Sequence, residues 1–286
     1  MIPFDWQEPA SLEAAIALLA EGDDSVRAFS GGTALMLMMK AGVFAPSCLV
    51  SLAKIGPHHS EIALTADGAL RIGAMASLSQ LEQARAVAEN FPVMRQALRT
   101  LSNVRVRNVA RVGGALAHGD PHMDLPPLLA SLGAIASVHG PSGRRDIAVE
   151  DLYKGYYETV LRRGELIESV TVPALGRARA TYVKVTSRSA DDWPALNLGL
   201  RLEMDDARIA GARIVVSAAT EKVARLHETE KLLQGQRPAD SLLIEAGDCA
   251  AREVAFLSDA HGSAAYKKEL LRVHLRRAVK ECAREP

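Results

Sequence analysis

"RNVARVGGALAHGDPHMDLPPLLASLGA", residues 107–134, is the stretch of this chain that says most about its fold. Its glycine pair, Gly113 and Gly114, leaves a short length of backbone without side chains, and bare backbone lets a ligand approach the main chain closely. The stretch ends in a predicted short helix that carries Pro126 and Pro127 in its first turn, where proline is well accommodated. The order of these features predicts a ligand-facing turn followed by a packed helix.

A second glycine pair, Gly31 and Gly32, lies upstream in "VRAFSGGTALMLMM". The residues before it predict a strand over 26–29, and those after it predict a helix over 34–40. Because free N–H groups at a strand-to-helix turn bind anions, two strand–glycine–glycine elements are expected to converge on one extended anion such as a pyrophosphate, with Thr33 as a hydroxyl donor. Neither pair belongs to a G-x-G-x-x-G or a G-x-x-x-x-G-K-S/T motif, so a tight turn without a ligand is the alternative.

The segment "HGDPHMD" invites a different interpretation, because His118, Asp120, His122 and Asp124 alternate along it. On a strand they would share one face and could bind a metal ion. Pro121 argues against a strand, and Asp124 is well placed to cap the following helix. We favour this second interpretation, in which the two histidines are solvated, since nothing else in the chain supplies a second shell for a metal.

Outside this stretch the chain predicts an α+β organisation. Ser11 caps a helix that stops at Gly22, residues 47–52 form a buried strand, and Asp67–Gly68 is a strong hairpin signal. From about residue 164 a block of strands precedes a block of helices, which is typical of a sheet with helices on one face. The predicted strands of this block are 165–173, 180–187, 195–205 and 208–219, with a turn at Asp205–Asp206, and the predicted helices are 221–234, 241–255 and 264–283.

Composition narrows the class of protein. The 286 residues include 34 basic and 34 acidic side chains, so charge points to neither nucleic acid nor an anionic membrane. No apolar run approaches the roughly 20 residues of a membrane span, and the start lacks a signal peptide's basic and apolar regions. Cys48, Cys249 and Cys282 lie far apart, which excludes a disulfide framework. We therefore expect a soluble, cytoplasmic protein.

Residues 107–134 resemble the pattern R-N-x-x-T-I-G-G-N-x-x-x-A-D-P-x-x-D-x-P-x-x-L-x-A-L-x-A of the FAD-binding medium subunit of molybdenum hydroxylases, a family that includes aerobic carbon monoxide dehydrogenase and xanthine dehydrogenase. "FSGGTALMLMMKAG" is similar to the family's first motif, A-G-G-T-D-L-x-x-x-M-K. "LVSLAKI", "IGAMASLSQLE" and "YVKVTSRSADDWPALNLGL" resemble further family segments in the same order. The resemblance therefore covers essentially the whole chain.

The resemblance implies a fold and its division. The family has a two-part FAD-binding domain of the vanillyl-alcohol-oxidase (PCMH) type, followed by a C-terminal α+β domain with a small antiparallel sheet and helices. We expect one FAD-binding subdomain over residues 1–57, a second over 58–173, and the C-terminal domain over 178–286. Residues 173–178 are the predicted linker.

The resemblance also implies which residues contact FAD. Asp124 would bond to the ribityl or ribose region, Lys184 would lie close to the flavin ring, Leu101 near the isoalloxazine and Ile167 near the adenine. If the resemblance is set aside, Lys184 is interpreted as an ordinary strand lysine that faces solvent. The backbone expected to wrap the pyrophosphate comprises Phe29, Ser30, Gly31, Gly32, Thr33, Ala34 and Leu35, together with Val112, Gly113, Gly114 and Ala115.

Three departures from the family motifs weaken the expected contacts. Ala34 replaces an aspartate, Arg111 a threonine and Ala115 an asparagine. Each change removes a polar side-chain contact worth about 1 kcal/mol, while the backbone contacts are retained. FAD binding is still expected, with weaker affinity or an altered flavin potential.

Taken together, the sequence predicts an electron-transfer flavoprotein subunit. In the family, a large subunit oxidises substrate at molybdopterin and a small subunit relays electrons through two 2Fe–2S clusters; FAD then passes them to NAD or another acceptor. Three scattered cysteines cannot hold a four-thiolate cluster, so partner subunits must carry the clusters. The resemblance implies an assembly of large, medium and small subunits, and we expect a dimer of such heterotrimers. The alternatives are a structural subunit that has lost its flavin and a self-contained flavin oxidoreductase; against the latter, no nucleophile or acid–base constellation stands out.

Overall fold

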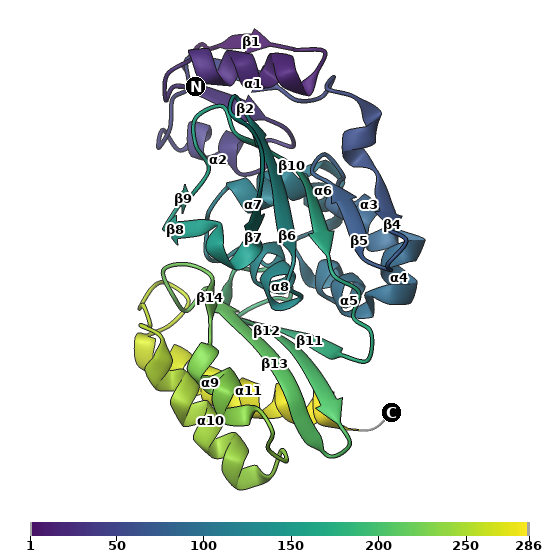
Figure 1. The fold of residues 1–286 in the computed structure, drawn as a ribbon. Coiled ribbons are helices and arrows are strands. Elements are labelled where there is room, and N and C mark those ends of the chain that lie inside the picture. The colour runs from purple at the N-terminus through teal and green to yellow at the C-terminus, as the bar shows by residue number, and fades with distance from the viewer. Residues whose placement is uncertain (1, 285–286) are drawn as a thin grey trace.

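Three sheets follow one another along the length of the molecule (Figure 1). The structure is a computed structural model, and it describes residues 2–284. The N-terminal sheet is parallel, with β3 between β1 and β2. Its elements are β1 (Asp5–Gln7), α1 (Leu12–Glu21), β2 (Val26–Phe29), α2 (Leu35–Lys40) and β3 (Cys48–Ser51).

Local signals explain this first part. Ser11 caps α1 as predicted, because its hydroxyl accepts the Ala14 N–H at 3.1 Å. The apolar face of α1, with Leu12 and Ile16, packs with Val50 of β3 in a small core. The turn that joins β2 to α2 contains the first glycine pair, as the sequence predicts.

The central sheet is antiparallel, in the order β4-β5-β10-β6-β7. The predicted hairpin at Asp67–Gly68 joins its first two strands, and Gly68 has the positive φ of +80° that such a turn favours. The strands and nearby short elements are η1 (Pro57–Ser60), β4 (Ile62–Leu64), β5 (Leu70–Gly73), β6 (Ile135–Gly140), β7 (Gly143–Ala148), η2 (Val149–Asp151), β8 (Tyr153–Gly155), β9 (Glu158–Thr159) and β10 (Leu166–Val172).

A run of short helices lies between β5 and β6 in the chain and covers the central sheet. These helices and the sheet share one large core, in which Phe91, Met94 and Leu128 are almost completely buried. Their bounds are α3 (Leu78–Gln83), α4 (Arg85–Asn90), α5 (Pro92–Thr100), α6 (Val104–Val109), α7 (Val112–Ala117) and α8 (Leu125–Ser131).

The C-terminal sheet is an antiparallel meander in the order β11-β12-β13-β14. Helices α9, α10 and α11 cover its outer face in Figure 1, while α8 contacts β12 and β13 from the other side. The sheet therefore lies between the helical middle of the molecule and its own helices. The bounds are β11 (Arg179–Thr186), β12 (Pro194–Asp205), β13 (Arg208–Ser217), β14 (Ala224–Arg225), α9 (His227–Leu233), α10 (Asp240–Glu253) and α11 (Ala264–Ala283).

The structure differs from the sequence predictions at three elements. The strand over 165–173 belongs to the central sheet, where β10 pairs with β5 and β6, and not with the strands that follow it. The helix predicted from residue 221 starts only at His227, because β14 occupies part of that range. The second glycine pair follows a helix and not a strand, and Gly113 and Gly114 lie inside α7.

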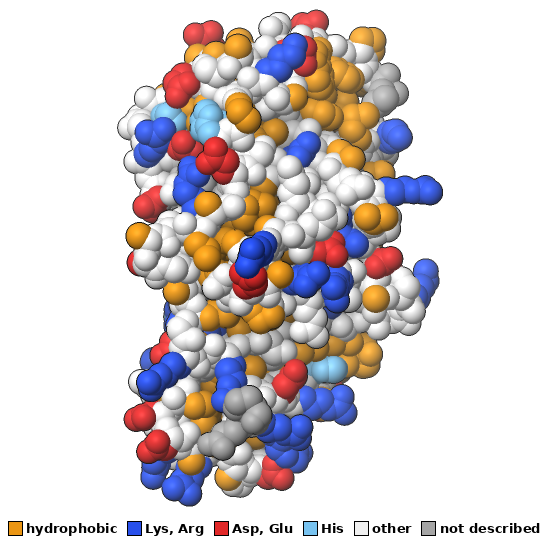
Figure 2. All heavy atoms as spheres, turned by 90° about the vertical axis from the view of Figure 1, so that its right-hand side faces the viewer, with side chains coloured by type: hydrophobic (Ala, Val, Ile, Leu, Met, Phe, Trp, Pro, Cys, Tyr) orange, Lys and Arg blue, Asp and Glu red, His pale blue; other side chains and the backbone are white. Residues whose placement is uncertain are grey.

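The distribution of charged side chains on the surface is consistent with the equal numbers of basic and acidic residues in the sequence. On the face in Figure 2, basic and acidic side chains both occur along the whole length of the molecule. None of the helices within residues 2–284 is both long and apolar enough to cross a bilayer.

Candidate functional site

One cavity of about 660 Å³ brings the two glycine segments together with residues of the C-terminal sheet. Its volume lies within the range of small-molecule and cofactor sites. Val112 is the one predicted site residue that does not line it, because this side chain, in the first turn of α7, is completely buried in the core. The predicted residues that do line the cavity are Phe29, Ser30, Gly31, Gly32, Thr33, Ala34, Leu35, Leu101, Gly113, Gly114, Ala115, Asp124, Ile167 and Lys184.

The first glycine pair shapes the turn between β2 and α2. Gly32 has φ +66°, a conformation that residues with a Cβ rarely adopt. A Cβ on Gly31 would lie 2.3 Å from the carbonyl oxygen of Val109, so only glycine lets this turn lie against the end of α6. The N–H groups from Gly31 to Ala34 have no acceptor among residues 2–284, and they line the cavity. This arrangement suits an anion.

The second glycine pair lies in the first turns of α7. A Cβ on Gly113 would lie 2.8 Å from that of Ala74, and the Gly113 N–H donates to the Ala74 carbonyl at 2.8 Å. A Cβ on Gly114 would lie 3.0 Å from the Ser30 hydroxyl oxygen. The two glycine segments are therefore neighbours in space, as the sequence analysis expects.

Arg111, the residue before α7, lines the same cavity as the two glycine segments. One guanidinium nitrogen donates to the Met75 carbonyl at 3.2 Å, while the buried Nε has no partner among the described residues. The chain therefore places a cation, with unused hydrogen-bonding capacity, where the family motif has a threonine. The expectation that this departure simply removes a polar contact is incomplete.

Asp124 and Lys184 form a buried ion pair at another part of the cavity wall. Their side chains are 9% and 6% exposed, and Lys184 Nζ lies 3.1 Å from Asp124 Oδ2. Lys184 also donates to the Thr100 carbonyl at 3.0 Å, and the Tyr182 hydroxyl donates to Asp124 at 3.2 Å. Burial raises the pKa of Asp124 above its usual value, although Lys184 and Tyr182 oppose the rise.

Two alternatives from the sequence are therefore settled. Lys184 does not face solvent, so that interpretation is wrong. Asp124 does occupy the residue before α8, but its carboxylate makes no capping hydrogen bond and turns to Lys184 instead.

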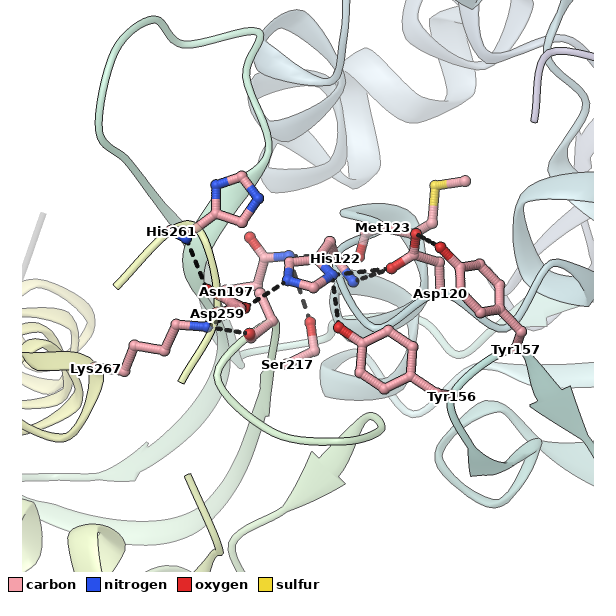
Figure 3. Close-up of polar contacts among 11 residues, drawn as sticks. Asp120, His122, Met123, Tyr156, Tyr157, Asn197, Ser217, Asp259, His261 and Lys267 are labelled. Atoms are coloured by element: carbon pink, nitrogen blue, oxygen red, sulfur yellow. Dashed lines mark hydrogen bonds and ion pairs between the residues drawn. The ribbon is translucent and has the colours of Figure 1, made fainter. Parts of the chain in front are cut away.

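The environment of His122 differs most from the one that the sequence predicts. It is expected to be solvated, yet it is only 9% exposed and lies between two carboxylates (Figure 3). Its Nδ1 is 3.0 Å from Asp120 Oδ1 and its Nε2 is 3.1 Å from Asp259 Oδ2. Asp259 in turn accepts from Lys267, whose side chain is completely buried.

Aromatic side chains surround this histidine at the edge of the cavity. The Tyr156 hydroxyl lies 3.4 Å from His122 Nδ1, and the Tyr157 hydroxyl donates to Asp120 at 3.0 Å. The Trp193 ring meets the His122 ring edge-on at 5.9 Å between centroids. His118, Asp120, His122, Tyr157 and Trp193 all line the cavity.

The sequence contains no local signal for these partners, because Asp259 is 137 residues from His122 along the chain. The metal interpretation of "HGDPHMD" finds no support in the geometry. Within residues 2–284, no three His, Cys, Asp or Glu side chains are grouped so that they could hold a metal ion.

Two family models match the chain. The model described as "FAD binding domain in molybdopterin dehydrogenase" covers residues 2–175, and the one described as "CO dehydrogenase flavoprotein C-terminal domain" covers residues 181–282.

Curated relatives are similar over nearly their full length. The nicotine 6-hydroxylase medium subunit of Paenarthrobacter nicotinovorans is 31% identical, with 96% of each chain covered. The carbon monoxide dehydrogenase medium chain of Afipia carboxidovorans is 30% identical, with 98% of this chain and 97% of the relative covered.

Solved structures have the same fold. A chain of Cu,Mo-CO dehydrogenase in its cyanide-inactivated form superposes with a TM-score of 0.93 at 30% identity, with 99% of each chain covered. A chain of quinoline 2-oxidoreductase from Pseudomonas putida 86 gives a TM-score of 0.90 at 29% identity, with 99% of this chain and 97% of that chain covered. The predicted fold class, with a PCMH-type FAD-binding domain and a C-terminal α+β domain, is confirmed.

Proposed function

Because the chain belongs to the family of FAD-binding medium subunits of molybdenum hydroxylases, we propose that its central cavity holds FAD and serves electron transfer from partner subunits to an external acceptor. The observation that carries this proposal is the meeting of both glycine segments, Arg111 and the Asp124–Lys184 pair in one cavity. When bound, FAD supplies a ring that can accept electrons singly and release them as a pair.

The pyrophosphate fits the glycine end of this cavity. FAD carries two phosphate charges, and this end offers the free N–H groups of the turn from Gly31 to Ala34 together with the guanidinium of Arg111. Backbone donors and one cation are the chemistry that an anion needs. Replacing the family's side chains with Ala34 and Ala115 leaves these donors in place.

The flavin ring is assigned to the part of the cavity near Asp124, Lys184 and Leu101. Lys184 is held by two acceptors, so its charge is fixed in place, and a fixed cation near the ring favours a reduced, anionic flavin. Asp124 positions Lys184 and presents an oxygen to a ligand hydroxyl. Leu101 is 8% exposed and adds an apolar wall, and Ile167 lines the cavity on the β10 side.

The electron path requires partners. Cys48, Cys249 and Cys282 are free and separate, so this chain holds no four-cysteine cluster site within residues 2–284. We propose a small subunit with 2Fe–2S clusters as electron donor, a large molybdopterin subunit as the site of substrate oxidation, and a dimer of heterotrimers as the assembly. NAD or another acceptor would take electrons from the flavin, in the cytoplasm.

The glycine positions give a direct test. In Gly32→Val the new side chain would clash with the Phe29 ring, and in Gly114→Val it would crowd the Ser30 hydroxyl; both residues line the proposed pyrophosphate end of the cavity. We therefore expect the purified variants to lose FAD while they stay folded. The measurement is flavin released per chain on denaturation, with circular dichroism to check folding.

Gly42→Val is the matched control for this experiment. Gly42 has φ +70°, close to the value at Gly32, but a Cβ there meets no atom within 4 Å and the residue does not line the cavity. Backbone strain is therefore similar, and FAD should be retained. Stoichiometric flavin in both cavity variants would show that the pyrophosphate lies elsewhere.

A further inference from the structure

The His122 cluster consists of His122, Asp120, Asp259 and Lys267. None of the FAD contacts proposed above uses it, yet its geometry is highly specific. A carboxylate oxygen faces each ring nitrogen of His122, at 3.0 Å from Nδ1 and 3.1 Å from Nε2. A neutral imidazole has one N–H and can donate to only one of these acceptors. The doubly protonated ring, an imidazolium, donates to both.

The charge count of the cluster leads to the same protonation state. Lys267 contributes one positive charge and is completely buried, while Asp259 and Asp120 contribute two negative charges. A protonated His122 balances the set, whereas a neutral ring leaves one poorly solvated carboxylate without a counter-charge, which is costly.

The tyrosine and tryptophan side chains around His122 do not change this balance, because the hydroxyls of Tyr156 and Tyr157 and the Trp193 ring are neutral. The other titratable group that faces His122 is His261, whose ring centroid lies 5.4 Å from that of His122. Burial by itself would lower the pKa of His122, but its hydrogen bonds to the two aspartates raise it above the ordinary value of 6.5.

His122 also lies in a loop of the FAD-binding domain that contacts the C-terminal domain. The loop 119–124 forms part of the cavity wall, and three contacts fix it to the C-terminal domain. They are the His122–Asp259 contact, a hydrogen bond of 2.9 Å from the Ala218 N–H to the Pro121 carbonyl, and one of 3.4 Å from Asn197 Nδ2 to the Met123 carbonyl. Figure 3 draws the one between His122 and Asp259. The loop ends at Asp124 on the cavity wall, so any movement of the loop reaches the proposed flavin site.

We propose that the imidazolium of His122 locks the loop 119–124 onto the C-terminal domain, and that FAD binding weakens when His122 loses its proton. His122 is a positioning residue, acting through the loop and Asp124. This inference rests on the proposed function, since it takes the cavity to be the FAD site.

The direction of the pH effect follows from the pKa shifts of His122 and Asp259. A raised pKa means that the contribution of His122 is fully present at low pH and is lost as pH rises through that value. Asp259, whose pKa is lowered to about 2, stays ionised throughout this range, because the bonds from Lys267 and His122 outweigh the effect of its burial. If FAD binding and His122 protonation are coupled by about one pKa unit, the FAD dissociation constant rises about tenfold from pH 6 to pH 9.

The first experiment is FAD titration of the full-length apoprotein at pH 6, 7, 8 and 9. The wild type should show the tenfold rise, while His122→Gln, which cannot carry a charge, should bind weakly with little pH dependence. His227→Gln is the matched control, because this exposed histidine at the start of α9 does not line the cavity, and it should keep the wild-type pH profile. A wild-type profile in His122→Gln, or a flat one in the wild type, would overturn the proposal.

The second experiment needs no flavin and separates this inference from the proposed function. Nitrogen-15 NMR of the histidine side chains in the apoprotein should show that His122 keeps its second proton to a pH above the ordinary value of 6.5, with amide exchange across 119–124 accelerating once it titrates. A His122 that loses its second proton at or below that value refutes the lock even if FAD binds normally. A chain with no FAD affinity refutes the proposed function, while the NMR result still decides whether the lock exists.

Discussion

Arg111 shows how a single substitution in a motif can change the chemistry of a site without removing it. The family pattern has a threonine hydroxyl here, whereas this chain has a guanidinium on the wall of the cavity that both glycine segments line. Its Nε is buried without a partner within residues 2–284, and a buried polar group without a hydrogen bond is rare in native proteins. The guanidinium also lines the cavity, where its positive charge favours a bound phosphate. We therefore interpret Arg111 as a compensation for Ala34 and Ala115.

This interpretation predicts the outcome of Arg111→Met. A hydrogen bond to a charged group is worth about 1.5–3 kcal/mol, so the FAD dissociation constant should rise about ten- to a hundredfold. Riboflavin has no phosphate, and its affinity should not change. Arg105→Met removes an exposed arginine of α6 and serves as the control. Equal loss of FAD and riboflavin affinity would mean that Arg111 supports the fold and not the pyrophosphate.

At the scale of elements, the start of α8 illustrates a conflict between a local and a distant interaction. Asp124 has the position of a helix cap, but its carboxylate bonds to Lys184 of β11 and makes no cap. The helix tolerates this because Pro126 in its first turn has no N–H that needs an acceptor. The distant ion pair therefore determines where the side chain points.

The buried pair predicts a non-additive mutational result. Asp124→Ala leaves the Lys184 ammonium buried without its counter-charge, so the free energy of unfolding should fall by about 3–5 kcal/mol. In Asp124→Ala with Lys184→Met, most of this stability should return, while FAD affinity stays low because both proposed flavin contacts are missing. Urea unfolding and FAD titration of the single and double variants check this. Additive stability losses would contradict the role of the pair.

Local signals predicted most elements correctly and failed where pairing is distant. The Ser11 cap and the turn after β12 depend on neighbouring residues. The cap is where the sequence places it, and the turn predicted at Asp205–Asp206 lies one residue later, at 206–207. The membership of β10 in the central sheet depends on pairing with β5, a strand that precedes it by several helices, so no local pattern records it.

The same distinction applies to the site. Glycine pairs and the acidic residue of a motif can be read from the chain, and they line the cavity as expected. Asp259 and Lys267 could not be predicted as partners of His122, because an isolated aspartate in a loop and a lysine in a helix look like ordinary surface residues. Asp259 meets His122, and so links it to Lys267, only because the C-terminal domain lies against the loop 119–124.

At the scale of the whole molecule, the cavity is the site to which both domains contribute residues. It is lined by the turn after β2, by α7, by β10 and by residues of β11 and β12, so both domains contribute to one site. A ligand that fills it must hold the two domains together. FAD should therefore raise the unfolding temperature of the chain as well as colour it.

The measurement that tests the account most directly is the flavin content of the purified, full-length chain. We predict one FAD per chain, either as isolated or after incubation with FAD, with the flavin released on denaturation. The structural-subunit alternative predicts a colourless protein. A chain that takes up no FAD under these conditions, and whose unfolding temperature FAD does not change, would contradict the assignment of the cavity.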